Sequence, residues 1–240
     1  MPAVFVNTFT VLAGSLIGIL FRNRLKESLR NAVMKALGLC TVLIGVSSAV
    51  ATQDLLCVIV CMVLGTVLGE LMRIDDGIEH AGDAIKAKLL RGKAGGGAME
   101  SFTEGFVSAC ILFCIGSMTI MGSLEAGIRH NYSIIYAKSA LDFVSSMAFA
   151  AAMGFGVPCS ALFILVFQGG LTLLAGLVGP ALSQDVVLEM SAVGGTILIG
   201  MAVNMLGLGK ERIKVANMLP AIFLPIAYFP IAAWISGLLG

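Results

Sequence analysis

The sequence predicts an all-α, polytopic integral membrane protein with about eight transmembrane helices, part of which form an inverted three-helix repeat. Composition is the first observation behind this fold class. Hydrophobic residues make up 58% of the chain and charged residues 12%, about half the charged share of a soluble protein. The second observation is length, because crossing a bilayer takes about 20 apolar residues. Eight stretches meet this requirement, at about 2–21, 33–53, 55–72, 102–122, 134–153, 157–179, 188–208 and 216–238.

The third observation is the placement of basic residues. Twelve Lys and Arg residues lie in the loops between the first and second, the third and fourth, and the seventh and eighth predicted spans. On the other predicted side, the loops contain only Arg129. Because basic loops are retained in the cytoplasm, this asymmetry predicts that the N-terminus and the C-terminus both lie outside.

Two pairs of short matches predict the internal repeat. Residues 10–14 read TVLAG and residues 172–176 read TLLAG, while residues 41–45 read TVLIG and residues 196–200 read TILIG. The matching spans are predicted to run in opposite directions, as in the inverted repeats of many transporters. Chance recurrence is the alternative, because the chain has 29 glycines.

The repeat divides a single membrane domain, residues 1–240, into four parts. We predict that residues 1–73 hold the first repeat, with the first three spans, and that residues 155–240 hold the second, with the last three. Residues 101–154 hold the fourth and fifth spans. Residues 74–100 hold a Gly-rich linker and, before it, an amphipathic helix with apolar residues at three- and four-residue spacing. This helix is expected to lie along the inner leaflet, and a surface for a partner is the alternative.

Motifs around the fourth to seventh spans resemble those of a known family. They read EGFVS at 104–108, FCIG at 113–116, MTIMGS at 118–123 and YAKSALD at 136–142, and KVANMLPA at 214–221 extends the match. In these motifs the chain is similar to the YdfK/YqgA-type family of bacterial inner-membrane proteins, a domain of unknown function, although Phe143 stands where the family has glycine. The resemblance covers essentially the whole chain. It implies a bacterial inner-membrane protein, and the family's usual label of transport protein implies a role in transport.

An ionisable pair inside a predicted span is the strongest chemical candidate. Lys138 and Asp142 are four residues apart, which places them one helical turn apart on the same face. Burying a charge in hydrocarbon costs at least about 2.5–3.5 kcal/mol, and each charge of the pair lowers this cost for the other. The pair is either a coupling site that is broken and remade during transport, or an internal ion pair that fixes helix packing.

Other polar residues are candidates for a solute site. A carboxylate at the start of the fourth span would line the inner mouth of the route. The hydroxyl- and glycine-rich end of the same span would form a broken helix that offers backbone groups to a solute. Polar residues on the repeated spans would complete the site, although close packing and interhelical hydrogen bonds are the structural alternatives. These candidates are Glu104, Ser117, Thr119, Ser123, Gln168, Thr172 and Asn204.

Prolines in the last predicted span indicate a change of helix direction. Pro220, Pro225 and Pro230 each remove a backbone donor and kink a helix. The span is therefore either a hinge with freed carbonyls or a statically curved helix.

Missing motifs narrow the class of function. The chain has no GxxxxGKS/T loop, no HExxH and no Cys-x-x-Cys. No histidine lies inside a predicted span to activate a nucleophile. We therefore expect no enzyme activity, no cofactor and no metal site, and we interpret the Cys57/Cys61 and Cys110/Cys114 pairs as apolar packing. The basic loops lack the interleaved aromatic residues of nucleic-acid-binding surfaces, so we expect no nucleic-acid partner.

The leading functional hypothesis is a secondary transporter of an ion or small polar solute across the bacterial inner membrane. Lys138 and Asp142 would carry the charge coupling. A passive channel is the nearest alternative, and a structural or assembly protein is the alternative from a different class. The expected partners are the lipid bilayer and a small solute or ion, and GxxxG faces leave a homodimer open.

Overall fold

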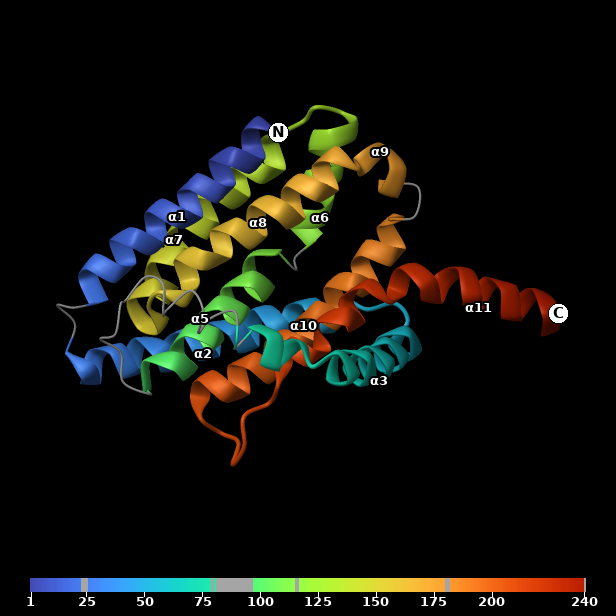
Figure 1. Cartoon of the computed structure of the whole chain (residues 1–240). Helices are drawn as coiled ribbons and strands as arrows, with labels where there is room; N and C mark the ends of the chain where they lie inside the picture. The colour runs from blue at the N-terminus through green and yellow to red at the C-terminus, as the bar shows by residue number, and fades with distance from the viewer. Residues whose placement is uncertain (23–25, 79, 81–96, 115–116, 180–181, 240) are drawn as a thin grey trace.

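The computed structural model describes residues 1–22, 26–78, 80, 97–114, 117–179 and 182–239. All regular secondary structure in these residues is helical, which confirms the all-α class (Figure 1). In chain order the helices are α1 (Pro2–Arg22), α2 (Glu27–Ala49), α3 (Leu55–Met72), α5 (Gly97–Cys114), α6 (Ser117–Ile128), α7 (Ser133–Met153), α8 (Gly156–Leu173), α9 (Ala175–Val178), α10 (Gln184–Leu206), η2 (Val215–Phe223) and α11 (Pro225–Leu239).

Six of these helices are each long and apolar enough to cross a bilayer, namely α1, α2, α3, α7, α8 and α10. Two further candidate spans are bent. In the pair α5–α6, the parts Glu104–Cys114 and Met118–Ile128 are inclined by 55°, and in the pair η2–α11, the parts Val215–Phe223 and Pro225–Ile235 are inclined by 49°. When each bent pair is counted once, the described residues contain eight candidate spans, which agrees with the sequence.

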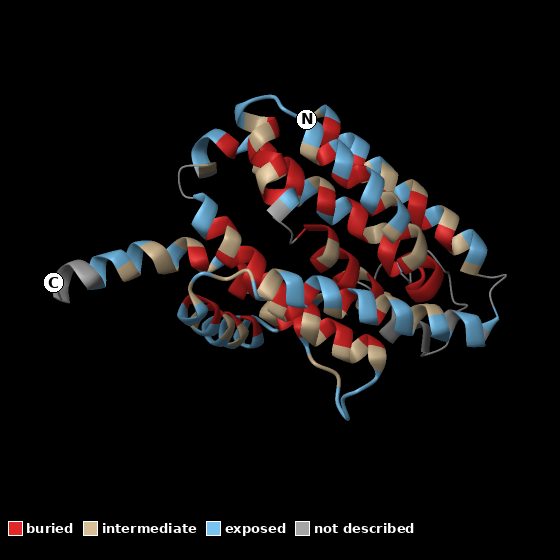
Figure 2. Ribbon diagram, turned by 180° about the vertical axis from the view of Figure 1, so that it is seen from behind, coloured by how far each residue is buried: buried red, intermediate tan, exposed pale blue. Residues whose placement is uncertain are grey.

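Apolar side chains cover the outer surface of the helical bundle. Leu20 on α1, Leu43 on α2 and Leu71 on α3 are all largely exposed. Figure 2 shows exposed residues along the outward faces of the helices and buried residues along the faces that meet. A soluble protein rarely exposes this much contiguous apolar surface, whereas lipid chains surround it in a bilayer. The chain is therefore a membrane protein.

Helices that are distant in sequence pack along one another. α1 lies along α7 and α8, α2 along α10, and α3 along η2, while α5 and α6 pack on α8 (Figure 1). The contacts α1–α8, α2–α10 and α3–η2 join each predicted repeat helix to its counterpart. The duplication itself stays a prediction, because matched positions differ in their surroundings. A Cβ at Gly14 would overlap α7, whereas a Cβ at Gly176 would have nothing within 4 Å.

Glycines set the closest helix crossings. A Cβ at Gly14 on α1 would lie 2.4 Å from the carbonyl oxygen of Phe143 on α7. On α3, a Cβ at Gly69 would lie 1.8 Å from the carbonyl oxygen of Asn217, and a Cβ at Gly65 would lie 2.2 Å from the Cα of Ala221, both on η2. The GxxxG pattern of α3 therefore serves helix packing within the chain.

Segments predicted to lie on the cytoplasmic side contact one another. Arg22, at the end of α1, lies against Gly154 after α7, and a Cβ at Gly154 would overlap the guanidinium group. Arg212, before η2, forms an ion pair of 3.8 Å with Asp75, just beyond α3. Four predicted cytoplasmic connections thus contact one another in two pairs, and the members of each pair are far apart in sequence.

The predicted cytoplasmic amphipathic helix is described only at its start. Residues 74–78 are helical and follow Arg73, which ends α3 in a left-handed conformation with a φ of 50°. The rest of this helix, apart from His80, and the Gly-rich linker before Gly97 lie outside the described residues.

Prolines account for the bend in the last span. η2 is a 3-10 helix that contains Pro220, and α11 begins at Pro225 and contains Pro230. Because proline lacks an N–H group and crowds the preceding turn, the single helix expected over 216–238 is interrupted. Figure 1 shows α11 extending away from the body of the protein toward the C-terminus.

Candidate functional site

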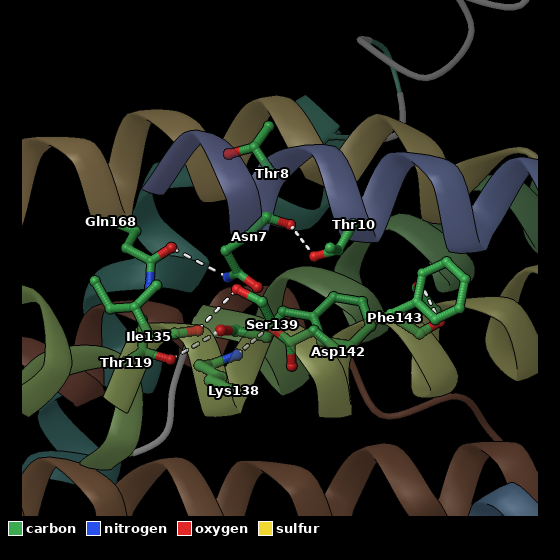
Figure 3. A network of polar contacts seen from close by, with 12 residues as sticks. Asn7, Thr8, Thr10, Thr119, Ile135, Lys138, Ser139, Asp142, Phe143 and Gln168 are labelled. Atoms are coloured by element: carbon green, nitrogen blue, oxygen red, sulfur yellow. Dashed lines mark hydrogen bonds and ion pairs between the residues drawn. The ribbon is translucent and has the colours of Figure 1, made fainter. Parts of the chain in front are cut away.

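A charged pair is buried in the middle of α7. Lys138 and Asp142 are each 6% exposed, and Lys138 Nζ contacts Asp142 Oδ2 in an ion pair (Figure 3). The four-residue spacing on one helical face produces this contact. Lys138 Nζ also lies 5.8 Å from the ring centroid of Phe113 on α5. The ammonium group therefore points into the protein and does not extend to the membrane surface.

Hydroxyl groups near the pair donate to backbone carbonyls. Ser139 Oγ donates to Ile135 O at 2.7 Å, and Ser123 Oγ donates to Thr119 O at 2.7 Å. Thr119 Oγ1 donates to Phe113 O at 2.9 Å. This last bond joins α6 to the end of α5 across the bend, so it satisfies a carbonyl that lacks its usual partner where the helix is interrupted.

Two amide side chains complete the polar cluster. Asn7 on α1 and Gln168 on α8 are both 0% exposed, and Asn7 Nδ2 donates to Gln168 Oε1 at 3.1 Å. Figure 3 shows the Asn7 side chain pointing from α1 toward Ser139 and Asp142 of α7. Asn7 is the residue that sequence reasoning missed. Its signal was present, because Asn7 is the only amide side chain in the apolar stretch 2–21.

The cluster lies well inside the bilayer-spanning part of the bundle. At 1.5 Å per residue, Lys138 is about 8 Å and Asp142 about 14 Å along α7 from its first residue, Ser133. Asn7 and Gln168 approach from α1 and α8, two of the helices that pack against α7. Two charges, two amides and several hydroxyls thus meet among apolar helices, at a depth where polar groups need partners.

Comparison with known proteins assigns a family. A family profile described as "Protein of unknown function (DUF554)" matches residues 2–230. The chain belongs to the DUF554 family. It is 29% identical over 231 residues to the uncharacterized membrane protein YdfK of Bacillus subtilis (strain 168), covering 94% of each chain. It is 32% identical over 231 residues to the uncharacterized protein YqgA of Escherichia coli (strain K12), covering 96% of each chain. The resemblance inferred from the motifs is confirmed, and no solved structure matches the chain.

Two predicted site residues of this DUF554 protein lie away from the ion pair. Asn204, near the end of α10, donates to Ile213 O at 2.8 Å and accepts from Ile213 N at 2.9 Å. Its amide therefore holds the loop before η2. Glu104 lines a pocket of about 190 Å³ together with Asn204 and the basic residues of that loop. Glu104, which we expected at the inner mouth of the route, is about 14 Å along α5 from Phe113. Asn204, which we expected in the solute site, lies beside Glu104.

The other predicted polar residues have separate positions. Thr172 is buried one turn beyond Gln168 on α8, and its hydroxyl donates to Gln168 O at 2.8 Å. Ser117 is the first residue of α6, and its side chain lies outside the described part of the chain. The structure thus brings Lys138, Asp142, Thr119 and Gln168 to one region. It places Glu104 and Asn204 in another.

A buried carboxylate on α10 contacts the turn between α2 and α3. Glu189 is the sixth residue of α10 and is 1% exposed. Its carboxylate accepts from Thr52 Oγ1 at 2.6 Å, from Gln53 N at 2.7 Å and from Asp54 N at 3.1 Å. Glu189 therefore anchors the turn between α2 and α3 to α10, because it accepts from three donors of that turn.

A second anchor lies at the other end of α3. Glu70 Oε2 accepts from Asn217 Nδ2 at 2.6 Å. Asn217 Oδ1 in turn accepts from Asp75 N at 2.7 Å. Asn217, the polar residue at the start of the bent last span, is therefore used to join η2 to α3.

A second hollow in the described part of this DUF554 protein is almost entirely apolar. A groove of about 520 Å³ between α3 and α11 is lined by apolar residues and Tyr228. In a bilayer, such a groove opens to lipid chains. Among the described residues, no group of three or more His, Cys, Asp or Glu side chains is placed to hold a metal ion.

Proposed function

We propose that this DUF554 protein is a secondary transporter that moves an ion or small polar solute across the bacterial inner membrane, driven by an ion gradient. The observation that carries the proposal is the Lys138–Asp142 ion pair, buried beside the Asn7–Gln168 amides where α1, α7 and α8 meet. Ionisable residues at membrane depth are rare and commonly mark ion or substrate pathways. In this role the protein needs no enzyme chemistry, cofactor or resident metal.

The ion pair suits a coupling role because each charge depends on the other. An unpaired charge in hydrocarbon costs at least about 2.5–3.5 kcal/mol. Neither Lys138 nor Asp142 therefore stays charged without the other while the pair is shut off from water. A proton or cation that reaches Asp142 takes away the partner of Lys138. The ammonium group then favours a conformation in which water reaches it. Ion binding is thereby linked to opening of the site.

The two bent spans would supply the movement. The bend between α5 and α6 lies next to Phe113, whose ring faces Lys138, and the bend between η2 and α11 lies at Pro225. Interrupted helices in transporters commonly lie at the substrate site. With both termini outside, as the placement of basic residues predicts, the pocket beside Glu104 is the cytoplasmic mouth of the route.

Transport currents on supported membranes test this proposal. Purified protein in liposomes would be exposed to gradients of ions, amino acids, organic acids and uncharged polar solutes. Wild type is expected to give a current for at least one class, and folded Asp142→Asn is expected to lose it. Glu125→Gln is the matched control, because it makes the same chemical change in the partly exposed Glu125–Arg129 pair at the end of α6.

Each other result points to a different function. A current that persists in Asp142→Asn would keep transport and return the ion pair to a packing role. A flux that never saturates as solute concentration rises would indicate a passive channel. Folded and inserted protein that gives neither current nor isotope uptake for any solute would overturn the proposal in favour of a structural or assembly role.

A further inference from the structure

Two buried amide atoms beside the ion pair have no partner. Asn7 Nδ2 donates to Gln168 Oε1, but Asn7 Oδ1 and Gln168 Nε2 have no hydrogen-bond partner among the described residues. Both side chains are fully buried. Such atoms are rare in folded proteins, because they lose their hydration without replacement. A group from outside the chain that pairs with both atoms would remove this cost.

We propose that the Asn7–Gln168 amide pair is the subsite for an uncharged hydrogen-bonding group, a carboxamide or a hydroxyl, on the transported solute. The inference rests on the proposed transport function and adds the chemical class of the group recognised. Asn7 and Gln168 are then the binding residues, and Lys138 and Asp142 carry the coupling.

The two unused atoms define this class. One is an acceptor and the other a donor. A carboxamide presents a donor and an acceptor side by side, and a hydroxyl carries both. A carboxylate offers acceptors only and would face Asn7 Oδ1 with like partial charge, whereas an ammonium group offers donors only. If the oxygen and nitrogen atoms of both side-chain amides are interchanged, the two atoms left without a partner are still one donor and one acceptor.

The surrounding charges also disfavour an ion. Lys138 and Asp142 neutralise each other, α8 has no charged side chain, and the charged side chain of α1 is Arg22 at its far end. On α6, Glu125 pairs with Arg129 near the surface. An ion held between Asn7 and Gln168 would therefore lack a counter-charge in a medium of low dielectric constant.

The position of the pair fits a ligand site. Thr10 and Thr172 are counterparts in the predicted repeat. Asn7 lies three residues before Thr10, and Gln168 lies four residues before Thr172. The two amides thus meet where the helices of the predicted repeats cross. In transporters with inverted repeats, substrate sites lie at such an interface.

Three molecules of one shape test the assignment. Acetamide offers a donor and an acceptor, acetate offers acceptors with a negative charge, and acetamidinium offers donors with a positive charge. Binding to the purified full-length protein would be measured by saturation-transfer NMR titration. Acetamide is expected to bind saturably, and acetate and acetamidinium are expected to bind roughly tenfold or more weakly.

Variants then locate the binding. Asn7→Leu, Gln168→Leu and the double variant are each expected to weaken acetamide binding by roughly tenfold or more. The double variant removes both amides at once, so it leaves no unpaired member of the pair and keeps the test valid when a single variant fails to fold. Gln53→Leu changes an exposed amide in the turn between α2 and α3 and is expected to bind acetamide as wild type does.

The outcomes separate this inference from the proposed function. Acetamide binding that disappears in the folded double variant supports the subsite. The subsite would be overturned if acetate or acetamidinium bound as tightly as acetamide, or if acetamide still bound to the double variant. It would also be overturned if acetamide did not bind at all, because the amides would then hold only water. Because NMR reads binding without flux, bound acetamide in a protein that transports nothing would overturn the transport proposal alone. Currents from a protein that does not bind acetamide would overturn the subsite alone.

Discussion

At the scale of single residues, the buried polar side chains differ in how their hydrogen bonds are used. Asn204 uses both polar atoms of its amide on one backbone segment. Lys138 and Asp142 satisfy each other's charge. Asn7 and Gln168 each keep an unused atom. A side chain whose bonds are all used within the chain stabilises the fold, whereas unused capacity in a buried place is available to a ligand.

Removing one member of the ion pair should destabilise the protein more than removing both. Asp142→Leu leaves Lys138 buried without its partner and is expected to lower the free energy of unfolding by about 3–5 kcal/mol. Lys138→Met combined with Asp142→Leu replaces the pair by apolar groups and is expected to recover most of the loss. Thermal unfolding in detergent measures both. Unchanged stability in Asp142→Leu would mean that Lys138 finds water or another partner.

At the scale of elements, close backbone contacts and buried anchors decide how the helices are joined. α1 approaches α7 because Gly14 leaves room for a carbonyl oxygen, and this crossing brings Asn7 to the face of α7 that carries Asp142 (Figure 3). The ends of α3 are joined to α10 by Glu189 and to η2 by Asn217. Of the bent pairs, α5–α6 packs on α8, and η2 packs along α3 while α11 extends away from the body (Figure 1).

Gly14 and Gly176, which occupy matching positions in the predicted repeat, offer a direct comparison. Gly14→Ala would place a Cβ 2.4 Å from both Phe143 O and Ser146 Oγ, so it is expected to lower the free energy of unfolding by about 1–3 kcal/mol. Gly176→Ala adds its Cβ where no atom lies within 4 Å. It is expected to be neutral or stabilising by up to about 1 kcal/mol. Detergent unfolding curves for the two variants test the pair, and equal effects would contradict a tight α1–α7 crossing.

The anchor on α10 predicts a second stability effect. Glu189→Leu leaves the Thr52 hydroxyl and the Gln53 N–H group without their acceptor, whereas the Asp54 N–H group keeps its bond to Thr52 Oγ1. The expected loss is about 1–3 kcal/mol for each donor that water does not reach. Glu189→Gln keeps one acceptor oxygen and is expected to lose less. The order of the two unfolding temperatures checks the assignment, and the reverse order would show that Glu189 is no anchor.

At the scale of the whole molecule, the chain forms one bundle in which early and late helices interleave. The contacts α1–α8, α2–α10 and α3–η2 each join helices from opposite halves of the sequence. Such a bundle cannot be divided into two halves that fold separately without exposing the faces that meet. Its outward faces (Figure 2) carry many exposed apolar residues, and the charges of its loops predict its orientation in the membrane.

The orientation is open to a direct test. Single cysteines placed at Lys26 and at Asn131, in a chain whose own cysteines are replaced, lie in loops predicted to face opposite sides. In intact cells freed of their outer membrane, an impermeant thiol reagent is expected to label the Asn131 position and to leave the Lys26 position unlabelled. Labelling in the reverse pattern would place the termini inside.

Much of the fold could be predicted from the sequence because helix formation in a bilayer is a local requirement. Every backbone polar group must be satisfied within its own segment, so long apolar stretches such as those of α1 and α10 identify spans without reference to neighbours. The spacing of Lys138 and Asp142 likewise determined their contact, because i and i+4 positions meet in any α-helix. The prolines of the last span predicted a change of direction at this same local level.

Which polar groups meet was decided by the tertiary structure alone. Asn7 and Gln168 are 161 residues apart, and nothing in either segment specifies the other as a partner. The same is true of Glu189 with the turn after α2, and of Asn204 with Ile213. The sequence by itself determined a membrane protein of about eight spans, with Lys138 and Asp142 one turn apart inside the fifth span. Only the crossing of α1 with α7 and α8 created a buried cluster with unused hydrogen-bonding atoms, because such contacts depend on packing between distant helices and not on local helix geometry.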